Sequence, residues 1–176
     1  RRREALTLLD TLPGAIFAEM FGDPRDNPHG YEAGTIGDLL DDVRYGTSNK
    51  AGAEGALPIL RMGNITYEGR MDLGDLKRID LSEKDIPKHT VRRGDILFNR
   101  TNSAELVGKT AIFNEDETYA FAGYLVRARV SNGNRPEYVA GYLNSPHGKK
   151  VLRNMAKNIV GMANINAKEM QKIPIL

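Results

Sequence analysis

With 176 residues, 40% of them hydrophobic and none of them cysteine, the chain can bury one sizeable core and excludes disulfides, thiolate zinc sites and cysteine nucleophiles. Only three histidines are present and no apolar run is long enough to span a membrane, so we expect no metal, no membrane partner and a cytoplasmic location. The net charge of +2 is too small to indicate a nucleic-acid partner by itself.

The N-terminal stretch predicts a helix that packs against another helix, because its apolar residues recur every three or four positions. These residues are Ala5, Leu9, Leu12, Ile16 and Met20. Pro13-Gly14 falls inside the pattern and predicts either a kink or a second helix capped by Thr11. Gly22-Asp23-Pro24 then ends the helix.

Short apolar runs separated by Gly, Asn and Asp predict strands between Tyr31 and Val130. The runs cover residues 58–62, 95–98, 107–113 and 119–130. The polar residues 114–117 are suited to a hairpin between the last two runs. Residues 37–43 and 75–79 are expected to form short helices.

Helical signals return after residue 134. Pro136 fits the first turn of one helix, and Ser145-Pro146 starts a second that continues through Met155. Asn166 is expected to cap a final turn, residues 167–171. The sequence therefore predicts a strand-rich, mixed α+β domain with flanking helices.

The nearest approach to a catalytic motif is Gly108-Lys109-Thr110, which resembles the end of a phosphate-binding loop. Ser103 occupies the position of the required first glycine, and the segment is expected to begin a strand rather than a helix. No motif for methyl transfer or for a dinucleotide is present. A nucleotide-binding enzyme is therefore only an alternative interpretation.

Three polar segments have the composition of a nucleic-acid surface, since cations, small hydroxyl or amide side chains and glycine occur together. They are residues 44–50, 61–66 and 99–103. Basic residues are also concentrated in 88–109 and 147–172, whereas 71–87 is acidic. Composition alone leaves DNA, RNA, an acidic protein or no partner at all as possible explanations of these loops.

In their order along the chain, several segments resemble the specificity subunits of type I restriction-modification systems. The segments are residues 17–24, 45–51, 60–65, 94–100 with 107–112, and 173–175. The resemblance covers essentially the whole chain and departs from the family pattern at Pro13-Gly14, which interrupts a helix that is often continuous.

The resemblance implies a DNA target-recognition domain that reads one half of a bipartite target in double-stranded DNA. Residues 1–22 would be a truncated conserved-region helix, 23–165 the recognition domain and 166–176 the start of the next conserved region; a half-length variant is the alternative. Methyltransferase subunits, and restriction subunits bound through them, would be the partners. S-adenosylmethionine, ATP and magnesium would belong to those partners, leaving this chain non-catalytic and without a cofactor.

The resemblance and the polar loops together predict ten residues for contact with DNA. They are Arg44, Thr47, Ser48, Lys50, Arg61, Asn64, Arg100, Asn102, Ser103 and Lys109. Two other functions stay open: a nucleotide-binding enzyme built around Gly108-Lys109-Thr110, and a protein-interaction module that uses the helix between Ala5 and Phe21.

Overall fold

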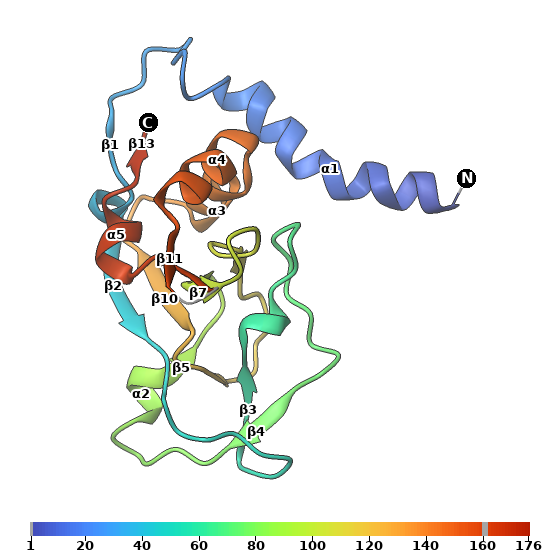
Figure 1. Cartoon of the computed structure of the whole chain (residues 1–176), viewed down its shortest axis with the longest axis vertical. Helices are drawn as coiled ribbons and strands as arrows, with labels where there is room; N and C mark the ends of the chain where they lie inside the picture. The colour runs from blue at the N-terminus through green and yellow to red at the C-terminus, as the bar shows by residue number, and fades with distance from the viewer. Residues whose placement is uncertain (1, 160–161) are drawn as a thin grey trace.

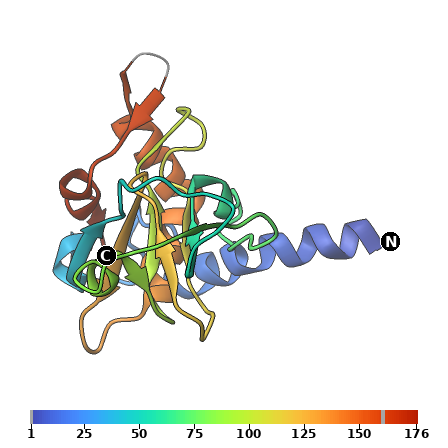
Figure 2. The same ribbon diagram turned by 90° about the horizontal axis from the view of Figure 1, so that it is seen from below.

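The computed structural model describes residues 2–159 and 162–176 and has the mixed α+β architecture expected from the sequence (Figures 1 and 2). The helices are α1 (Arg2–Phe21), α2 (Ile86–His89), α3 (Pro136–Asn144), α4 (Pro146–Met155) and α5 (Ala167–Gln171), with 3-10 turns η1 (Ile36–Leu39) and η2 (Met62–Asn64). The strands are β1 (Gly34–Thr35), β2 (Leu40–Tyr45), β3 (Leu57–Leu60), β4 (Lys77–Ile79), β5 (Thr90–Val91), β6 (Ile96–Asn99), β7 (Thr101–Asn102), β8 (Thr110–Ile112), β9 (Tyr119–Phe121), β10 (Leu125–Val130), β11 (Lys157–Ile159), β12 (Met162–Asn164) and β13 (Pro174–Ile175).

Two four-stranded sheets form the centre of the domain. One has the order β2-β10-β6-β8 and is antiparallel throughout, and the other has the order β4-β3-β9-β5 with β3 and β9 parallel. Smaller sheets join β11-β12-β7 and β1-β13. In Figure 1, β3, β4 and α2 lie at the end of the molecule opposite α1.

Strand β10 separates two hydrophobic clusters, because successive side chains of a strand point to opposite faces. Val126 and Ala128 pack with α3, α4 and α5 in the first cluster. Leu125 packs in the second cluster with residues of the other large sheet, including Phe121. The two sheets thus enclose the second cluster, and the C-terminal helices cover the outer face of the first sheet.

The strand alternation also places Arg127 between the sheets, where its side chain is 0% exposed. Its guanidinium donates to the Asp42 carboxylate at 2.6 Å and to the carbonyl oxygen of Thr90. Asp95, also buried, lies 4.0 Å from its Nε and accepts two hydrogen bonds from Arg129. A buried charge is tolerated only when it is paired in this way, and the hydrogen bond to Thr90 O links the buried guanidinium to the second sheet.

Helix α1 is a single helix that contains Pro13, and Gly22 follows it with a φ of 71°. It packs on α3 through Phe17, which contacts Tyr138 and leaves no room for a side chain at Gly141. Leu12, Ile16 and Met20 of the predicted stripe are exposed, while the side chains of Ala5 and Leu9 lie outside the described ones. The N-terminal part of α1 extends away from the domain (Figures 1 and 2).

Helices α3, α4 and α5 confirm the C-terminal predictions. Ser145 caps α4 by accepting a hydrogen bond from Gly148 N at 3.0 Å, and Asn166 caps α5 by accepting from Lys168 and Glu169. Pro146 fits the first turn of α4 because a proline there sacrifices no helical hydrogen bond.

Three local predictions are wrong. No hairpin joins the runs around residues 114–117: β8 pairs with β6 and β9 pairs with β3 and β5, so the chain crosses between sheets there. Residues 37–43 form the end of η1 and most of β2, and residues 75–79 contain β4. In each case pairing with a distant strand overrides the local preference of the segment.

The ion pair between Asp42 and Arg127 predicts that the stability of the fold depends on pH. Burial raises the pKa of Asp42, but hydrogen bonding and attraction from Arg127, with help from Arg44 and Arg129, outweigh burial and hold this pKa below its ordinary value. A lowered folded-state pKa stabilises the fold fully above about pH 4, and the effect is lost as the pH falls through the folded pKa. Asp42→Asn should therefore lower the free energy of unfolding at pH 7 by about 1 to 3 kcal/mol, and the deficit should shrink below about pH 4.

Urea denaturation of both proteins at a series of pH values measures this difference. Asp41→Asn is the matched control, because the Asp41 side chain is exposed one position earlier in the same strand. It should change stability by less than about 0.5 kcal/mol at every pH. An Asp42→Asn deficit that stays constant through the acid range would contradict the assignment.

Candidate nucleic-acid interface

Four segments that are far apart in the sequence meet around one hollow of about 700 Å³. They are the loop after β2, the turn η2 with the chain that follows it, Arg100 directly after β6, and the turn between β9 and β10. Of the ten predicted residues, five line the hollow: Thr47, Ser48, Arg61, Asn64 and Arg100. Four further polar residues that the sequence patterns did not single out as contact residues also line it: Asn49, Asp72, Asp75 and Tyr124.

The loop after β2 is anchored at its beginning and exposed at its tip. Thr47 N donates to Phe121 O at 2.9 Å, and Thr47 O accepts from Gly123 N at 2.8 Å. A Cβ at Gly46 would lie 2.2 Å from Ala122 O, so only glycine permits this approach. Thr47 is 5% exposed and its hydroxyl accepts from Asn49 N, whereas Ser48 and Lys50 are exposed.

Asn64 organises the second segment from a buried position. Its side-chain amide donates to Asp72 O at 2.8 Å and Asp75 O at 2.9 Å, and its Oδ1 accepts from Arg61 N at 2.8 Å. Both amide hydrogens are therefore used within the protein. Arg61 donates through Nη2 to the Asp75 carboxylate at 2.9 Å, so this guanidinium is paired at the wall of the hollow.

The third predicted segment is divided between two places. Arg100 lines the hollow, and its Nε donates to Gly123 O at 2.9 Å. Asn102 instead belongs to β7, which pairs with β12, and its Oδ1 accepts from Ser103 N at 2.9 Å. Neither Asn102 nor the exposed Ser103 lines the hollow.

Lys109 and Arg44 also lie outside the lining of the hollow. Lys109 donates to the carbonyl oxygens of Met62 and Ile65, which ties η2 to the start of β8, and burial lowers the pKa of Lys109 while Glu68 opposes that change. Arg44 is exposed on β2 and pairs with Asp42 at 3.0 Å. Lys109 therefore stabilises the second segment through hydrogen bonds to its backbone, without lining the hollow itself.

Gly108-Lys109-Thr110 leads into strand β8 and not into a helix. Gly108 has a φ of 84°, and the Thr110 hydroxyl donates to Gly108 O within the same turn. A phosphate-binding loop needs free backbone N–H groups at a helix N-terminus. Nothing in this geometry favours the nucleotide-binding alternative.

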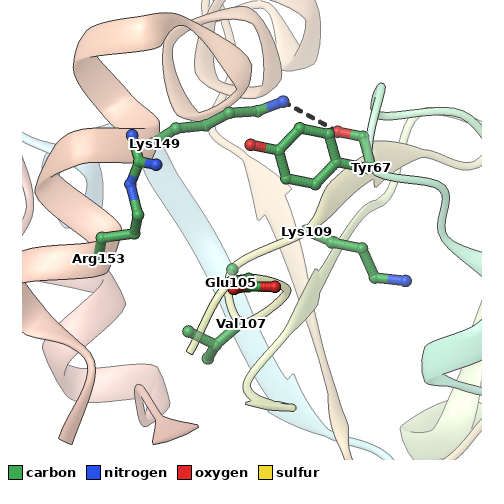
Figure 3. Close-up of a pocket in the computed structure, with 7 residues that line it drawn as sticks. Tyr67, Glu105, Val107, Lys109, Lys149 and Arg153 are labelled. Atoms are coloured by element: carbon green, nitrogen blue, oxygen red, sulfur yellow. Dashed lines mark hydrogen bonds between the residues drawn. The ribbon is translucent and has the colours of Figure 1, made fainter. Parts of the chain in front are cut away.

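A smaller pocket brings Lys109, Lys149 and Arg153 together with Glu105 (Figure 3). Lys149 donates to Tyr67 O at 3.0 Å and lies 3.6 Å from the centre of the Tyr67 ring. Burial lowers the pKa of Lys149, Glu68 raises it and Arg153 lowers it further. Figure 3 shows Lys149 directed at Tyr67 while Lys109 extends away from α4, so the cations do not converge on one ligand.

Among residues 2–159 and 162–176, no group of three His, Asp or Glu side chains is arranged to hold a metal ion. The helices of the described part of the chain are also too short or too polar to cross a membrane.

Comparison with known proteins gives related sequences and a shared fold, although no family model matches. The EcoKI type I restriction enzyme specificity subunit of Escherichia coli is 29% identical over 142 residues, covering 78% of this chain and 30% of that protein. The putative MjaX specificity subunit of Methanocaldococcus jannaschii is 29% identical over 154 residues, covering 84% of this chain and 36% of that protein. The chain thus spans about a third of these relatives.

Solved structures agree on the fold. The HsdS subunit of Thermoanaerobacter tengcongensis has a TM-score of 0.60 at 23% identity, covering 98% of this chain and 40% of that one. A chain from a study of assembly and conformational transition in a type I R-M system has a TM-score of 0.65 at 21% identity, covering 99% and 41%. The resemblance indicated by the sequence motifs is confirmed: in sequence and in fold, this chain is similar to specificity subunits of type I restriction enzymes, over a length that fits one domain of such a subunit.

Proposed function

We propose that this chain recognises one half of a bipartite sequence in double-stranded DNA and thereby directs partner methyltransferase and endonuclease subunits to the target. The relatives are specificity subunits, and the chain matches about a third of their length, which supports this role. The observation that carries the proposal is the hollow, where three polar segments converge on a scaffold of two packed sheets.

The hollow suits base edges better than a bare phosphate backbone. Arg61 and Arg100 supply donors, whereas the carboxylates of Asp72 and Asp75 supply acceptors. Base edges in the major groove present both donors and acceptors, but phosphates accept only and are repelled by carboxylates. The exposed Ser48 and Asn49 add short hydrogen-bonding side chains at the rim.

In this proposal the chain itself performs no chemistry. Methyl transfer and DNA cleavage, with S-adenosylmethionine, ATP and magnesium, belong to the partner subunits. One of the structural neighbours comes from work on complex assembly in a type I R-M system, which supports a role within an assembly. The cytoplasm, where such an assembly would meet DNA, is the proposed location.

The exposed face of α1 favours a second, compatible role in protein contact. Leu12, Ile16 and Met20 are 48%, 44% and 59% exposed, and clustered apolar side chains on a helix are typical of a packing surface. We retain residues 1–22, 23–165 and 166–176 as the proposed regions. Residues 166–176 nevertheless pack with the domain core, through Ala167, Met170 and Ile173.

Selection from random duplex DNA by the intact protein with its methyltransferase partner tests the proposal. We expect enrichment of one short sequence element that depends on this chain. Recovery of sequences without any common element would contradict it. Methylation or cleavage of DNA by the chain without partner subunits would contradict the non-catalytic role.

We predict that Lys50 contacts the phosphate backbone, because it is exposed next to the part of the loop that lines the hollow. Lys50→Ala should weaken binding to cognate and unrelated DNA by similar factors. It should also reduce the slope of log affinity against log salt concentration by about 0.9, because one fewer counterion is released. Titrations at several salt concentrations measure both effects.

Lys84→Ala is the matched control, because Lys84 is also exposed but lies in the acidic stretch before α2. Its substitution should leave the salt slope unchanged. A loss of preference for the cognate site in Lys50→Ala, with no change in slope, would mean that Lys50 contacts bases instead.

A further inference from the structure

Arg100 is held in position by contacts on several sides. Its Nε donates to Gly123 O at 2.9 Å, and its guanidinium carbon lies 5.0 Å from the centre of the Tyr45 ring. Its backbone is fixed as well, since Arg100 N donates to Tyr124 O and Arg100 O accepts from Ile165 N. The side chain is therefore oriented before any ligand arrives.

The Tyr45 ring, over which the Arg100 guanidinium lies, is itself held in place. The Tyr45 hydroxyl accepts a hydrogen bond from Ala167 N at 3.0 Å, which connects the end of β2 to the start of α5. Gly123, on the other side, donates to Thr47 O at 2.8 Å. Arginine stacks favourably on an aromatic face, so the ring fixes the plane of the guanidinium.

The unused part of the side chain is the pair of terminal nitrogens. Within the described residues, neither Nη1 nor Nη2 of Arg100 has a hydrogen-bond partner, and Arg100 lines the hollow. Arg61, the other arginine of the hollow, uses its Nη2 on Asp75. Arg100 thus offers the planar fork of two donors that is characteristic of bidentate recognition.

We propose that Arg100 reads a guanine in the DNA target, donating through its two terminal nitrogens to O6 and N7 in the major groove. This inference rests on the proposed function and assigns one base to one residue. Guanine alone presents two adjacent acceptors on this edge, whereas adenine pairs one acceptor with a donor. The carboxylates of Asp72 and Asp75 line the same hollow as Arg100, so the charge of the hollow does not favour a phosphate over a base edge.

The test combines a protein substitution with a change of one DNA atom. The cognate site is first obtained by selection with the intact protein and its partner subunits. Each guanine is then replaced in turn by 7-deazaguanine, which lacks the N7 acceptor, and affinity is measured for the original protein and for Arg100→Ala. At one guanine, we expect the replacement to weaken the original protein about tenfold and to leave Arg100→Ala unaffected.

Two further variants make the result specific. Arg100→Lys keeps the positive charge but lacks the planar fork, so its sensitivity to that same guanine should fall below that of the original protein. Arg93→Ala, which removes an exposed arginine paired with Asp116 outside the hollow, should keep full sensitivity.

Different outcomes separate the two proposals. A protein that selects a sequence but shows no coupling between Arg100 and any guanine overturns the inference alone. Equal weakening of cognate and unrelated DNA by Arg100→Ala assigns the residue to a phosphate and also overturns it. Failure to select any sequence overturns the proposed function.

Discussion

A buried arginine joins the two sheets on which the loops of the hollow are built. Arg127 extends from β10 of one sheet to Thr90 O of β5 in the other, and Asp42 of β2 neutralises its charge. An unpaired guanidinium at 0% exposure would be strongly unfavourable, and the hydrogen bond to Thr90 O favours the arrangement in which β5 lies next to this side chain. The turn between β9 and β10 connects these sheets directly and forms part of the hollow.

Most polar residues around the hollow are engaged in building it. The Asn64 amide donates hydrogen bonds to the backbone of residues 72 and 75, and Lys109 donates to the backbone of residues 62 and 65. Thr47 forms a β-bridge with the turn between β9 and β10. Such internal bonds immobilise loops that would otherwise lose conformational entropy on binding. The result is an anchored rim on which a few groups, above all the fork of Arg100, remain unengaged.

The sequence predicted the composition of the segments around the hollow more accurately than the individual residues that line it. Glycine with small polar and basic residues predicted three important segments, and all three contribute to the hollow. Within each segment, however, the pattern could not separate Arg100 from Asn102, because β7 turns aside to pair with β12. Asp72 and Asp75 were missed since they lie in an acidic stretch that resembles ordinary solvated surface.

Local signals of the sequence determined the elements that depend on neighbouring residues, namely α3, α4 and α5 with the caps Ser145 and Asn166, and the core strand β6. The order of the sequence motifs also determined the resemblance to specificity subunits. Only the tertiary structure decided the rest. Residues 75–79 contain a strand because β3 offers unpaired backbone groups, and residues 114–117 cross between sheets because β8 and β9 find partners elsewhere. The orientation of the Arg100 guanidinium also depends on the tertiary structure, because Tyr45 and Gly123, which contact it, come from distant parts of the chain. Caps and helical periodicity are short-range interactions, whereas strand pairing and the assembly of a hollow depend on contacts that appear only when the chain has folded.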